Sequence, residues 1–229
     1  MSEIAQQPSP NFDDRRFPVS MLVLHYTGMQ TGEAALERMC DPEASVSAHY
    51  MVWESGDVVQ LVDEDKRAWH AGVSRWQGEE ELNSRSIGIE IVNGGHDWRL
   101  EDGRLPPYPA SQIDAVIALS RDILARWSIP QTRIVGHSDI APTRKQDPGE
   151  HFPWARLAGQ GIGLWPLSLE ASQRPSIDAA LQAIGYDTSD LGAAVTAFQR
   201  RWRPARVDGL VDADTRSVAF AVADLYLAS

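Results

Sequence analysis

The hydrophobic and polar positions of the chain divide its first part into short strand-like runs separated by turns. Residues 19–26 form an apolar run of strand length, which is typical of a strand buried on both faces. Residues 86–93 alternate between apolar and polar side chains, and residues 134–136 are a short apolar run, so each predicts a further strand. Residues 46–53 and 58–62 flank a Glu-Ser-Gly-Asp turn and predict a β-hairpin.

Helical periodicity appears in two segments of the same part of the chain. Residues 111–127 repeat apolar side chains at helical spacing and predict an amphipathic helix with Ser111 as its cap. Thr31 is expected to cap a shorter helix over residues 33–39. The segments between these elements are expected to be loops, at residues 63–85, 94–107 and 138–154.

These patterns predict an α/β domain followed by a small helical domain. We assign residues 17–158 to the α/β domain and residues 159–173, which are broken by Gly and Pro, to a linker. Residues 174–229 are expected to form a three-helix domain with a core of its own, so that the larger domain folds without it. Residues 1–16 are polar and are expected to be a flexible arm. The three helical patterns lie at residues 177–184, 191–202 and 212–227, the last with Asp212 as its cap.

Charge and composition argue against several classes of protein. The net charge is −11, from 32 acidic and 21 basic side chains, and no run of Lys and Arg offers the phosphate contacts that nucleic-acid binding needs. No stretch approaches the roughly 20 apolar residues of a membrane-spanning helix. Cys40 is the only cysteine, which excludes an intramolecular disulfide and a Cys-based zinc site. We interpret Cys40 as a small buried hydrophobic residue.

The first 16 residues also lack the apolar core of a signal peptide. They predict a cytoplasmic protein if Met1 is the natural start. The alternative is a periplasmic or cell-envelope protein from which a leader was removed.

Two histidines and one aspartate have the spacing of a metal site. His25 ends the first predicted strand and His137 follows another, and the ends of central strands are where α/β sheets place functional groups. Asp147 follows ten residues after His137. Two imidazoles and one carboxylate make a three-ligand zinc set that leaves a fourth position for water. A structural or surface role remains the alternative for each histidine taken alone.

Glu90 and Lys145 each have a structural and a catalytic interpretation. Strand alternation favours a solvent-facing Glu90, whereas a Glu90 that faces the metal would be partly buried, with a raised pKa suited to a general base. Lys145 is either a surface lysine or, two residues from Asp147, a group that reaches an oxyanion on the substrate. The residues alone leave both questions open.

Five sequence blocks, spread over residues 17–157, resemble the type 2 N-acetylmuramoyl-L-alanine amidases and occur in that family's order. The blocks are His25-Tyr-Thr, Ser47-Ala-His-Tyr, Ala68-Trp-His-Ala-Gly, Ser86-Ile-Gly-Ile-Glu and Val135-Gly-His-Ser-Asp-Ile-Ala-Pro-Thr-Arg-Lys-Gln-Asp-Pro-Gly. The resemblance implies a mixed β-sheet flanked by helices, with zinc in a groove. It also implies cleavage of the amide bond between the muramic acid lactyl group and L-alanine, in peptidoglycan or muropeptides.

The same resemblance implies a role for each candidate residue. His25, His137 and Asp147 would bind zinc, Glu90 would be the general base, and Lys145 would stabilise the tetrahedral intermediate. We interpret the other histidines of these blocks as a framework residue, His49, and as groove walls, His70 and His151. We expect a monomer that binds peptidoglycan or a muropeptide.

The C-terminal segment has a resemblance of its own. Three blocks within residues 174–227 are similar to the three-helix peptidoglycan-binding module of wall hydrolases, and Phe198-Gln199 and Asp208-Gly209 are the most characteristic positions. The alternative is a stabilising appendage in which Phe198 is only a core residue. Tyr26 stands where several cytoplasmic recycling amidases carry Asn, which favours the cell-envelope branch and conflicts with the absent leader. Intact wall and anhydro-muropeptides therefore both remain as substrates.

Two other functions are compatible with parts of this pattern. A non-catalytic peptidoglycan receptor would usually lack one zinc ligand, and all three candidates are present here. A metallopeptidase that cuts within the stem peptide is the second alternative, but no His-Glu-x-x-His helix supports a zincin.

Overall fold

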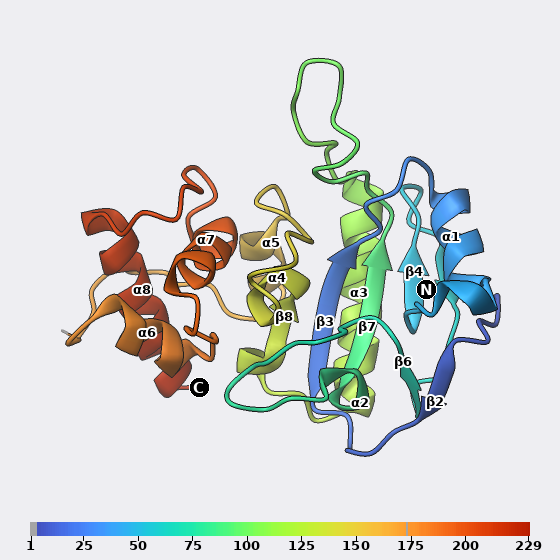
Figure 1. The fold of residues 1–229 in the computed structure, drawn as a ribbon, viewed down its shortest axis with the longest axis horizontal. Helices are drawn as coiled ribbons and strands as arrows, with labels where there is room; N and C mark the ends of the chain where they lie inside the picture. The colour runs from blue at the N-terminus through green and yellow to red at the C-terminus, as the bar shows by residue number, and fades with distance from the viewer. Residues whose placement is uncertain (1–3, 173) are drawn as a thin grey trace.

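The computed structural model describes residues 4–172 and 174–229, and in it a mixed β-sheet lies beside a bundle of three helices (Figure 1). Residues 1–3 of the predicted arm and residue 173 of the predicted linker lie outside the described residues. The sheet has the strand order β1-β5-β4-β7-β3-β8. The six strands are β1 (Ala5–Gln6), β3 (Met21–Tyr26), β4 (Tyr50–Val52), β5 (Val58–Gln60), β7 (Ser86–Ile91) and β8 (Ile134–Gly136). The predicted fold class, a mixed sheet flanked by helices, is confirmed.

Strand β3 lies between β7 and β8 and is parallel to both. Its side chains alternate between the two faces, and Leu22 and Leu24 pack in the cluster that contains the buried residues of helix α3 (Ala110–Arg126). Met21 and Val23 pack in a different cluster, on the opposite face. His25 shares that opposite face by alternation, so the sheet directs it away from α3.

The structure confirms one predicted helix cap and contradicts another. Helix α1 (Gly32–Cys40) begins after Thr31, whose hydroxyl accepts the backbone N–H of Ala34, as predicted. The predicted Ser111 cap is wrong, because α3 begins one residue earlier and has Pro109 at its N-cap position. The Ser111 hydroxyl instead donates a hydrogen bond to the Glu54 carbonyl, in the turn of the β4–β5 hairpin.

The predicted flexible arm and two of the predicted loops contain regular structure. The predicted flexible arm differs from the structure over its described part, where β1 pairs with β5 and β2 (Phe12–Asp14) pairs with β6 (Lys66–Ala68). The amide of Asn11 is buried and donates to three backbone carbonyls of the α1 region, which ties this segment down. The predicted loops also contain short helices, namely α2 (Leu82–Arg85), α4 (His137–Ile140), and the start of α5 (Trp154–Ala158). Two 3-10 turns complete the elements, η1 (Pro42–Ala44) and η2 (Gln131–Arg133).

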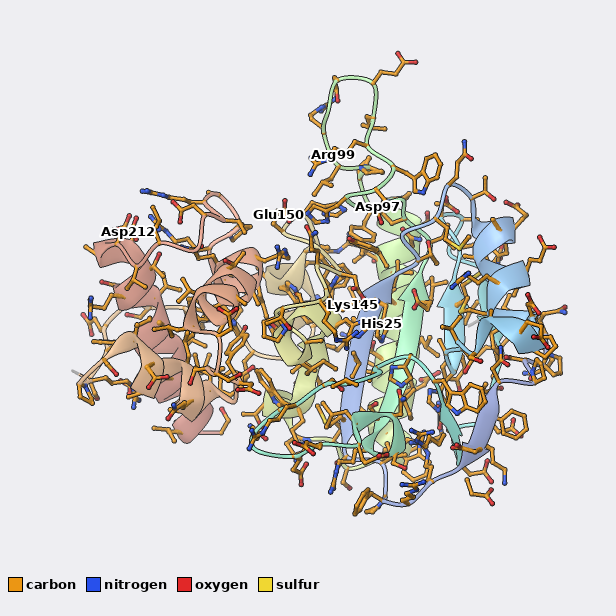
Figure 2. The ribbon with its side chains drawn as sticks, in the orientation of Figure 1. His25, Asp97, Arg99, Lys145, Glu150 and Asp212 are labelled. Carbon is orange, nitrogen blue, oxygen red and sulfur yellow. The ribbon has the colours of Figure 1, made fainter. Side chains whose placement is uncertain are left out.

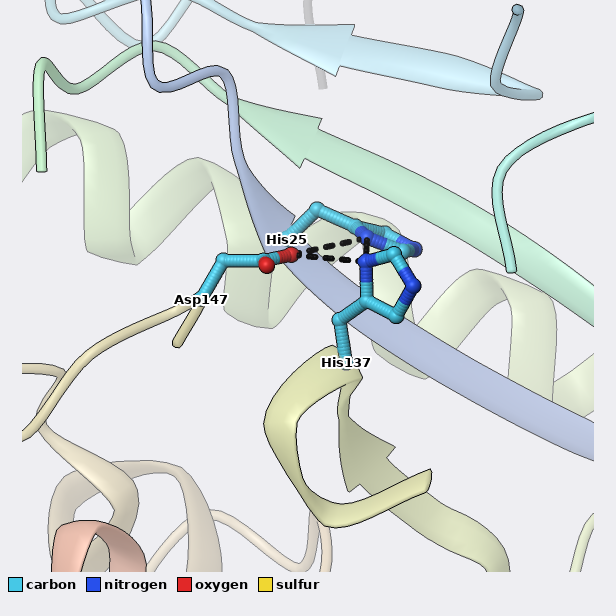
Figure 3. A group of neighbouring side chains, drawn as sticks. All are labelled: His25, His137 and Asp147. Carbon is cyan, nitrogen blue, oxygen red and sulfur yellow. Dashed lines mark hydrogen bonds and ion pairs between the residues drawn. The ribbon is translucent and has the colours of Figure 1, made fainter. Parts of the chain in front are cut away.

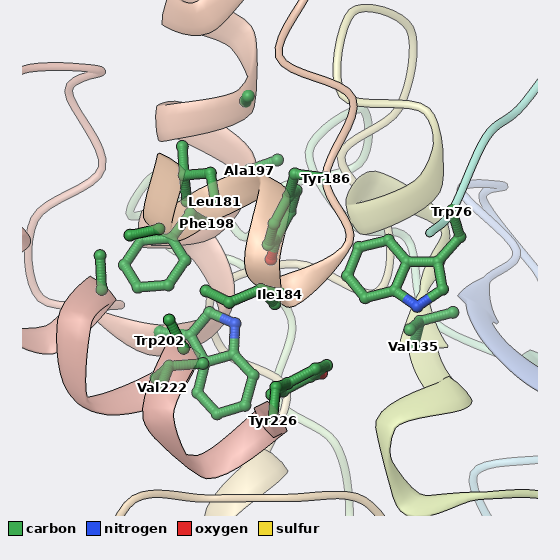
Figure 4. Packing of buried hydrophobic residues seen from close by; sticks show 14 of the residues in the cluster. Trp76, Val135, Leu181, Ile184, Tyr186, Ala197, Phe198, Trp202, Val222 and Tyr226 are labelled. Carbon is green, nitrogen blue, oxygen red and sulfur yellow. The ribbon is translucent and has the colours of Figure 1, made fainter. Parts of the chain in front are cut away.

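The C-terminal helices are α6 (Ile177–Ile184), α7 (Leu191–Trp202) and α8 (Ala213–Leu227), and Asp212 caps the last as predicted. Their buried side chains do not form a core of their own. They join one hydrophobic cluster with residues of the sheet domain, including Trp76 and Val135 (Figure 4). This shared core contrasts with the expectation of a domain that packs independently.

No helix among residues 4–172 and 174–229 is long and apolar enough to span a membrane.

Candidate metal centre and its groove

The three predicted metal ligands come together on one face of the sheet (Figure 3). His25 lies near the end of β3, His137 is the first residue of α4, and Asp147 lies in the loop beyond α4. Asp147 Oδ2 is 3.0 Å from Nδ1 of His25 and 3.0 Å from Nδ1 of His137, and the two Nδ1 atoms are 2.9 Å apart. All three side chains are buried. The strand register brings the two histidines together, because Leu24 pairs with Gly136, and His25 and His137 directly follow this pair.

The hydrogen bonds around His25 define which of its ring nitrogens carries the proton. The Ser86 hydroxyl donates to the Leu82 carbonyl at 2.5 Å, so its oxygen is free to accept Nε2–H of His70 at 3.3 Å. Nδ1 of His70 is then an acceptor, and Nε2–H of His25 donates to it at 3.0 Å. His25 therefore carries its proton on Nε2, and its Nδ1 lone pair points toward His137 and Asp147.

His137 is held in the same tautomer by a backbone group. Its Nε2–H donates to the Ala71 carbonyl at 3.1 Å, which leaves Nδ1 unprotonated. Two imidazole lone pairs and a carboxylate oxygen thus face one another within about 3 Å in a buried site. Three acceptors in this arrangement repel one another, and a cation between them satisfies all three. The separations are close to the roughly 3.3 Å that tetrahedral geometry sets between ligands about 2.0 Å from a zinc ion, so the residues fit that metal.

Electrostatics favours the ligand forms of these groups at neutral pH. Burial, with a smaller contribution from His137, lowers the pKa of His25 to about 4, so the ring is neutral. Burial alone would raise the pKa of the Asp147 carboxyl. The interactions with His137, followed by those with His25, outweigh burial and hold that pKa well below its ordinary value. Neutral imidazoles and an ionised carboxylate are the states that bind a metal.

Glu90 and Lys145 line the same cavity as His137 and Asp147, which has a volume of about 440 Å³. Glu90 pairs in register with His25 on the adjacent parallel strand, so it projects from the same face of the sheet and not to solvent. Its Oε2 atom is buried and has no hydrogen-bond partner among the described residues. Burial, and then the charge of Asp147, raises the pKa of Glu90 well above its ordinary value, while Lys145 lowers it. Figure 2 shows Lys145 close to His25 at the centre of the molecule.

The remaining histidines lie around this centre in different roles. His70 lines the cavity, and its Nδ1 accepts the hydrogen bond of Nε2–H of His25. The Ala68-Trp-His-Ala-Gly block led us to interpret His70 as a groove wall and did not indicate this hydrogen bond. His49 accepts the backbone N–H of Gly88 through Nδ1, as a framework residue does. His151 stacks on Tyr108, with ring centroids 4.8 Å apart, and is not among the residues that line the cavity.

Sequence reasoning did not indicate a row of hydrogen bonds that begins at Tyr26, a residue that lines the cavity. The Tyr26 hydroxyl donates to Nδ1 of His96 at 3.0 Å, and Nε2 of His96 donates to Glu150 at 3.0 Å. These three residues are separated by 70 and 54 positions, so only the folded chain brings them together. A larger cavity of about 640 Å³ lies beside α4 and shares Arg144 with the metal-centre cavity, but it contains none of the candidate ligands.

Comparison with known proteins identifies relatives over the whole chain. The family profile described as N-acetylmuramoyl-L-alanine amidase matches residues 15–150. The N-acetylmuramoyl-L-alanine amidase AmiD of Escherichia coli is 37% identical over 235 residues, covering 91% of this chain and 83% of its own. The 1,6-anhydro-N-acetylmuramyl-L-alanine amidase AmpD of Enterobacter cloacae is 38% identical over 169 residues, covering 66% of this chain and 86% of its own.

Solved structures of two relatives match over almost the full length. The complex of E. coli AmiD with anhydro-N-acetylmuramic acid-L-Ala-D-γ-Glu-L-Lys has a TM-score of 0.80 and 35% identity, and covers 98% of this chain and 93% of its own. The complex of AMPDH3 from Pseudomonas aeruginosa with an anhydromuramic pentapeptide has a TM-score of 0.80 and 33% identity, and covers 99% of both chains.

Proposed function

Since the chain belongs to the N-acetylmuramoyl-L-alanine amidase family, we propose that it hydrolyses the amide bond between the muramic acid lactyl group and L-alanine. The observation that carries this proposal is the buried cluster of His25, His137 and Asp147, whose three acceptor atoms face one another at a cavity also lined by Glu90 and Lys145. An anhydro-muropeptide is the proposed substrate, because E. coli AmiD and P. aeruginosa AMPDH3, which match over almost the full length, have each been solved in complex with an anhydromuramic ligand.

His25, His137 and Asp147 are the proposed zinc ligands. Their tautomers and charges suit a divalent cation, and three protein ligands are the number that a catalytic zinc site would use. When bound there, zinc supplies Lewis-acid activation of water and of the amide carbonyl. The protein's contribution is to hold the two rings by their Nε2–H groups, so that both lone pairs converge on one point.

Glu90 is the proposed general base. The buried Oε2 atom of its half-buried side chain has no hydrogen-bond partner among the described residues, so it is available to take a proton from the attacking water. As the new carbon–oxygen bond forms and the carbon–nitrogen bond breaks, the same carboxyl returns that proton to the departing amide nitrogen. The raised pKa suits both steps, because it brings the group closer to the pH at which it works.

Lys145 is the proposed stabiliser of the negative charge that develops on the carbonyl oxygen. Its positive charge acts within the cavity, since it lowers the pKa of both Glu90 and His25. A cation in a partly dehydrated site interacts with a developing oxyanion more strongly than one in water.

We also propose that residues 174–229 form a peptidoglycan-binding-like domain after the linker at residues 159–173. Its support is the sequence resemblance, and the structure gives the characteristic residues a structural explanation. Phe198 is fully buried, and the Gln199 side chain accepts the backbone N–H groups of Asp208 and Gly209. Co-sedimentation of a Glu90→Gln protein with intact sacculi tests binding without digestion. If the protein is absent from the pellet, the alternative holds, in which residues 174–229 only stabilise the fold.

Mass spectrometry of the products tests the proposed reaction. Anhydro-muropeptides and intact sacculi are incubated in parallel with the zinc-loaded protein, and with the protein after chelation. Release of a peptide that begins with L-alanine, only with the zinc-loaded protein, is the expected result. A cut within the stem peptide would support the metallopeptidase alternative, and binding without any cut would support the receptor.

A further inference from the structure

A buried arginine of the C-terminal bundle contacts the turn that carries His137. Arg201 lies on α7, and its Nη1–H donates to Oδ2 of Asp139 at 2.8 Å. Its Nη2–H donates to the backbone carbonyl of Ile134 at 3.1 Å. One guanidinium thus binds the chain three residues before His137 and two residues after it. The planar, fixed geometry of its donors suits this double contact.

The carboxylate of Asp139 depends on the C-terminal bundle for its partners. Besides Arg201, its Oδ1 accepts the hydroxyl of Tyr186, which follows α6, at 2.6 Å. Within its own turn, Oδ2 accepts the backbone N–H of Gly136 at 2.8 Å. The side chains of Arg201 and Asp139 are each 1% exposed, so water does not replace these partners. A buried charge that loses its partners forces the surrounding structure to rearrange.

A second contact reaches the other end of the same segment. Arg200, the neighbour of Arg201, lies 3.7 Å from a carboxylate oxygen of Glu150, three residues beyond Asp147. Glu150 in turn accepts the hydrogen bond of His96 that connects to Tyr26. Residues 134–150 carry two of the three proposed ligands, His137 and Asp147. Helix α7 therefore contacts this segment near its start, through Arg201, and at its end, through Arg200.

We propose that Arg201 is a positioning residue for the metal centre, so that the C-terminal bundle helps to build the site and is not only an attached module. This inference rests on the proposed function, since it concerns the proposed ligand His137. Arg201 does not touch a ligand side chain. It acts through Asp139, Gly136 and Ile134, which define the backbone from which His137 projects.

The test compares Arg201→Met with a matched control in the full-length protein. Arg203 follows the last residue of the same helix and also forms ion pairs, but with Asp212 and Asp214 of the bundle itself. Zinc affinity is measured by competition with a chromophoric chelator, and folding by circular dichroism of the metal-free proteins. We expect Arg201→Met to weaken zinc binding roughly tenfold, the lower end of what outer contacts of a metal site contribute. Arg203→Met should bind zinc like the unmodified protein.

Equal zinc affinity in Arg201→Met and the unmodified protein, or equal weakening in Arg201→Met and Arg203→Met, would overturn the inference. If Arg201→Met does not fold, Tyr186→Phe and Arg201→Lys decide it. The first removes one hydrogen bond to Asp139 and the second keeps the charge while losing the fork, so both should weaken zinc binding by less than tenfold. Unchanged affinity in both would also overturn it. Failure of the unmodified protein to bind zinc would instead contradict the proposed function.

Discussion

Replacing His70 with alanine removes the acceptor that holds Nε2–H of His25. The proton of His25 then has two options. It stays on Nε2 without a partner in a buried site, or it moves to Nδ1, where it blocks the metal position. Leaving a buried donor unsatisfied costs about 1–3 kcal/mol. A loss of about 10–100-fold in metal affinity, the usual effect of removing such an outer partner, lies in the same range. We therefore expect zinc to bind roughly 10–100-fold more weakly to His70→Ala.

A second substitution displaces the same ring without removing it. Gly88 lies beneath His70, and a Cβ added at Gly88 would be 2.5 Å from Cγ of that ring. Because that separation is too short, the ring of His70 must shift away from Nε2 of His25. Gly88→Ala should therefore weaken zinc binding in the same direction as His70→Ala.

Chelator competition measures zinc affinity for both variants, and near-ultraviolet circular dichroism reports whether each has folded. His151→Ala is the matched control, because His151 stacks on Tyr108 and forms no hydrogen bond with a proposed ligand. The reasoning would be refuted if a folded His70→Ala protein bound zinc within about twofold of the unmodified protein. It would also fail if His151→Ala lost as much affinity.

Glu90→Gln should lower turnover by roughly 10²-fold or more while zinc stays bound, and loss of zinc with it would make Glu90 a ligand or framework residue. Lys145→Met should lower turnover by roughly 10²–10³-fold with little change in zinc content, and full activity would remove Lys145 from the mechanism. Burial lowers the pKa of His25 to about 4 and that of His49 to about 3. Below pH 6.5 these two histidines are protonated in the unfolded chain and remain neutral in the folded chain. Each of them therefore lowers the free energy of unfolding of the metal-free protein by roughly 1.4 kcal/mol per pH unit as the pH falls toward 4. The raised pKa of Glu90 acts on the free energy of unfolding in the opposite direction above the ordinary pKa of a glutamate, but the two histidines outweigh this single group. We therefore expect the melting temperature to fall between pH 6.5 and pH 4.5, and a melting temperature that does not fall would contradict these pKa directions. The cytoplasmic location stays a prediction, which fractionation of cells that express the untagged protein would test. Recovery of most of the protein with the periplasmic fraction would contradict it.

Local signals predicted the elements that show a clear helical period or a continuous apolar run. The helices after residue 175 and the strands around His25 and His137 lie close to their predicted bounds for this reason. Strands β1 and β2 were missed because they are short and polar, and they exist only by pairing with β5 and β6, more than fifty residues away. No local pattern records such a partner.

The candidate site shows the same division. Residue types and strand ends were enough to select His25, His137 and Asp147 as a possible metal set. The side of the sheet on which Glu90 lies depended on its register with His25 in a neighbouring strand, which alternation alone could not supply. The contact between Arg201 and Asp139 joins residues 62 positions apart, and the block that contains Asp139 gives no indication of this partner.

That separation has a consequence for the order in which the protein matures. Ribosomes add roughly 5–20 residues per second, so Asp139 is synthesised about 3–12 s before Arg201. During this interval its carboxylate has no cationic partner from α7, and the hydrophobic surface around Trp76 and Val135 has no helical cover. We therefore expect a nascent chain to hold an incomplete metal site and to become competent for zinc only as its last helices are released. An interrupted translation product would then be a poor hydrolase, although it contains every proposed catalytic residue.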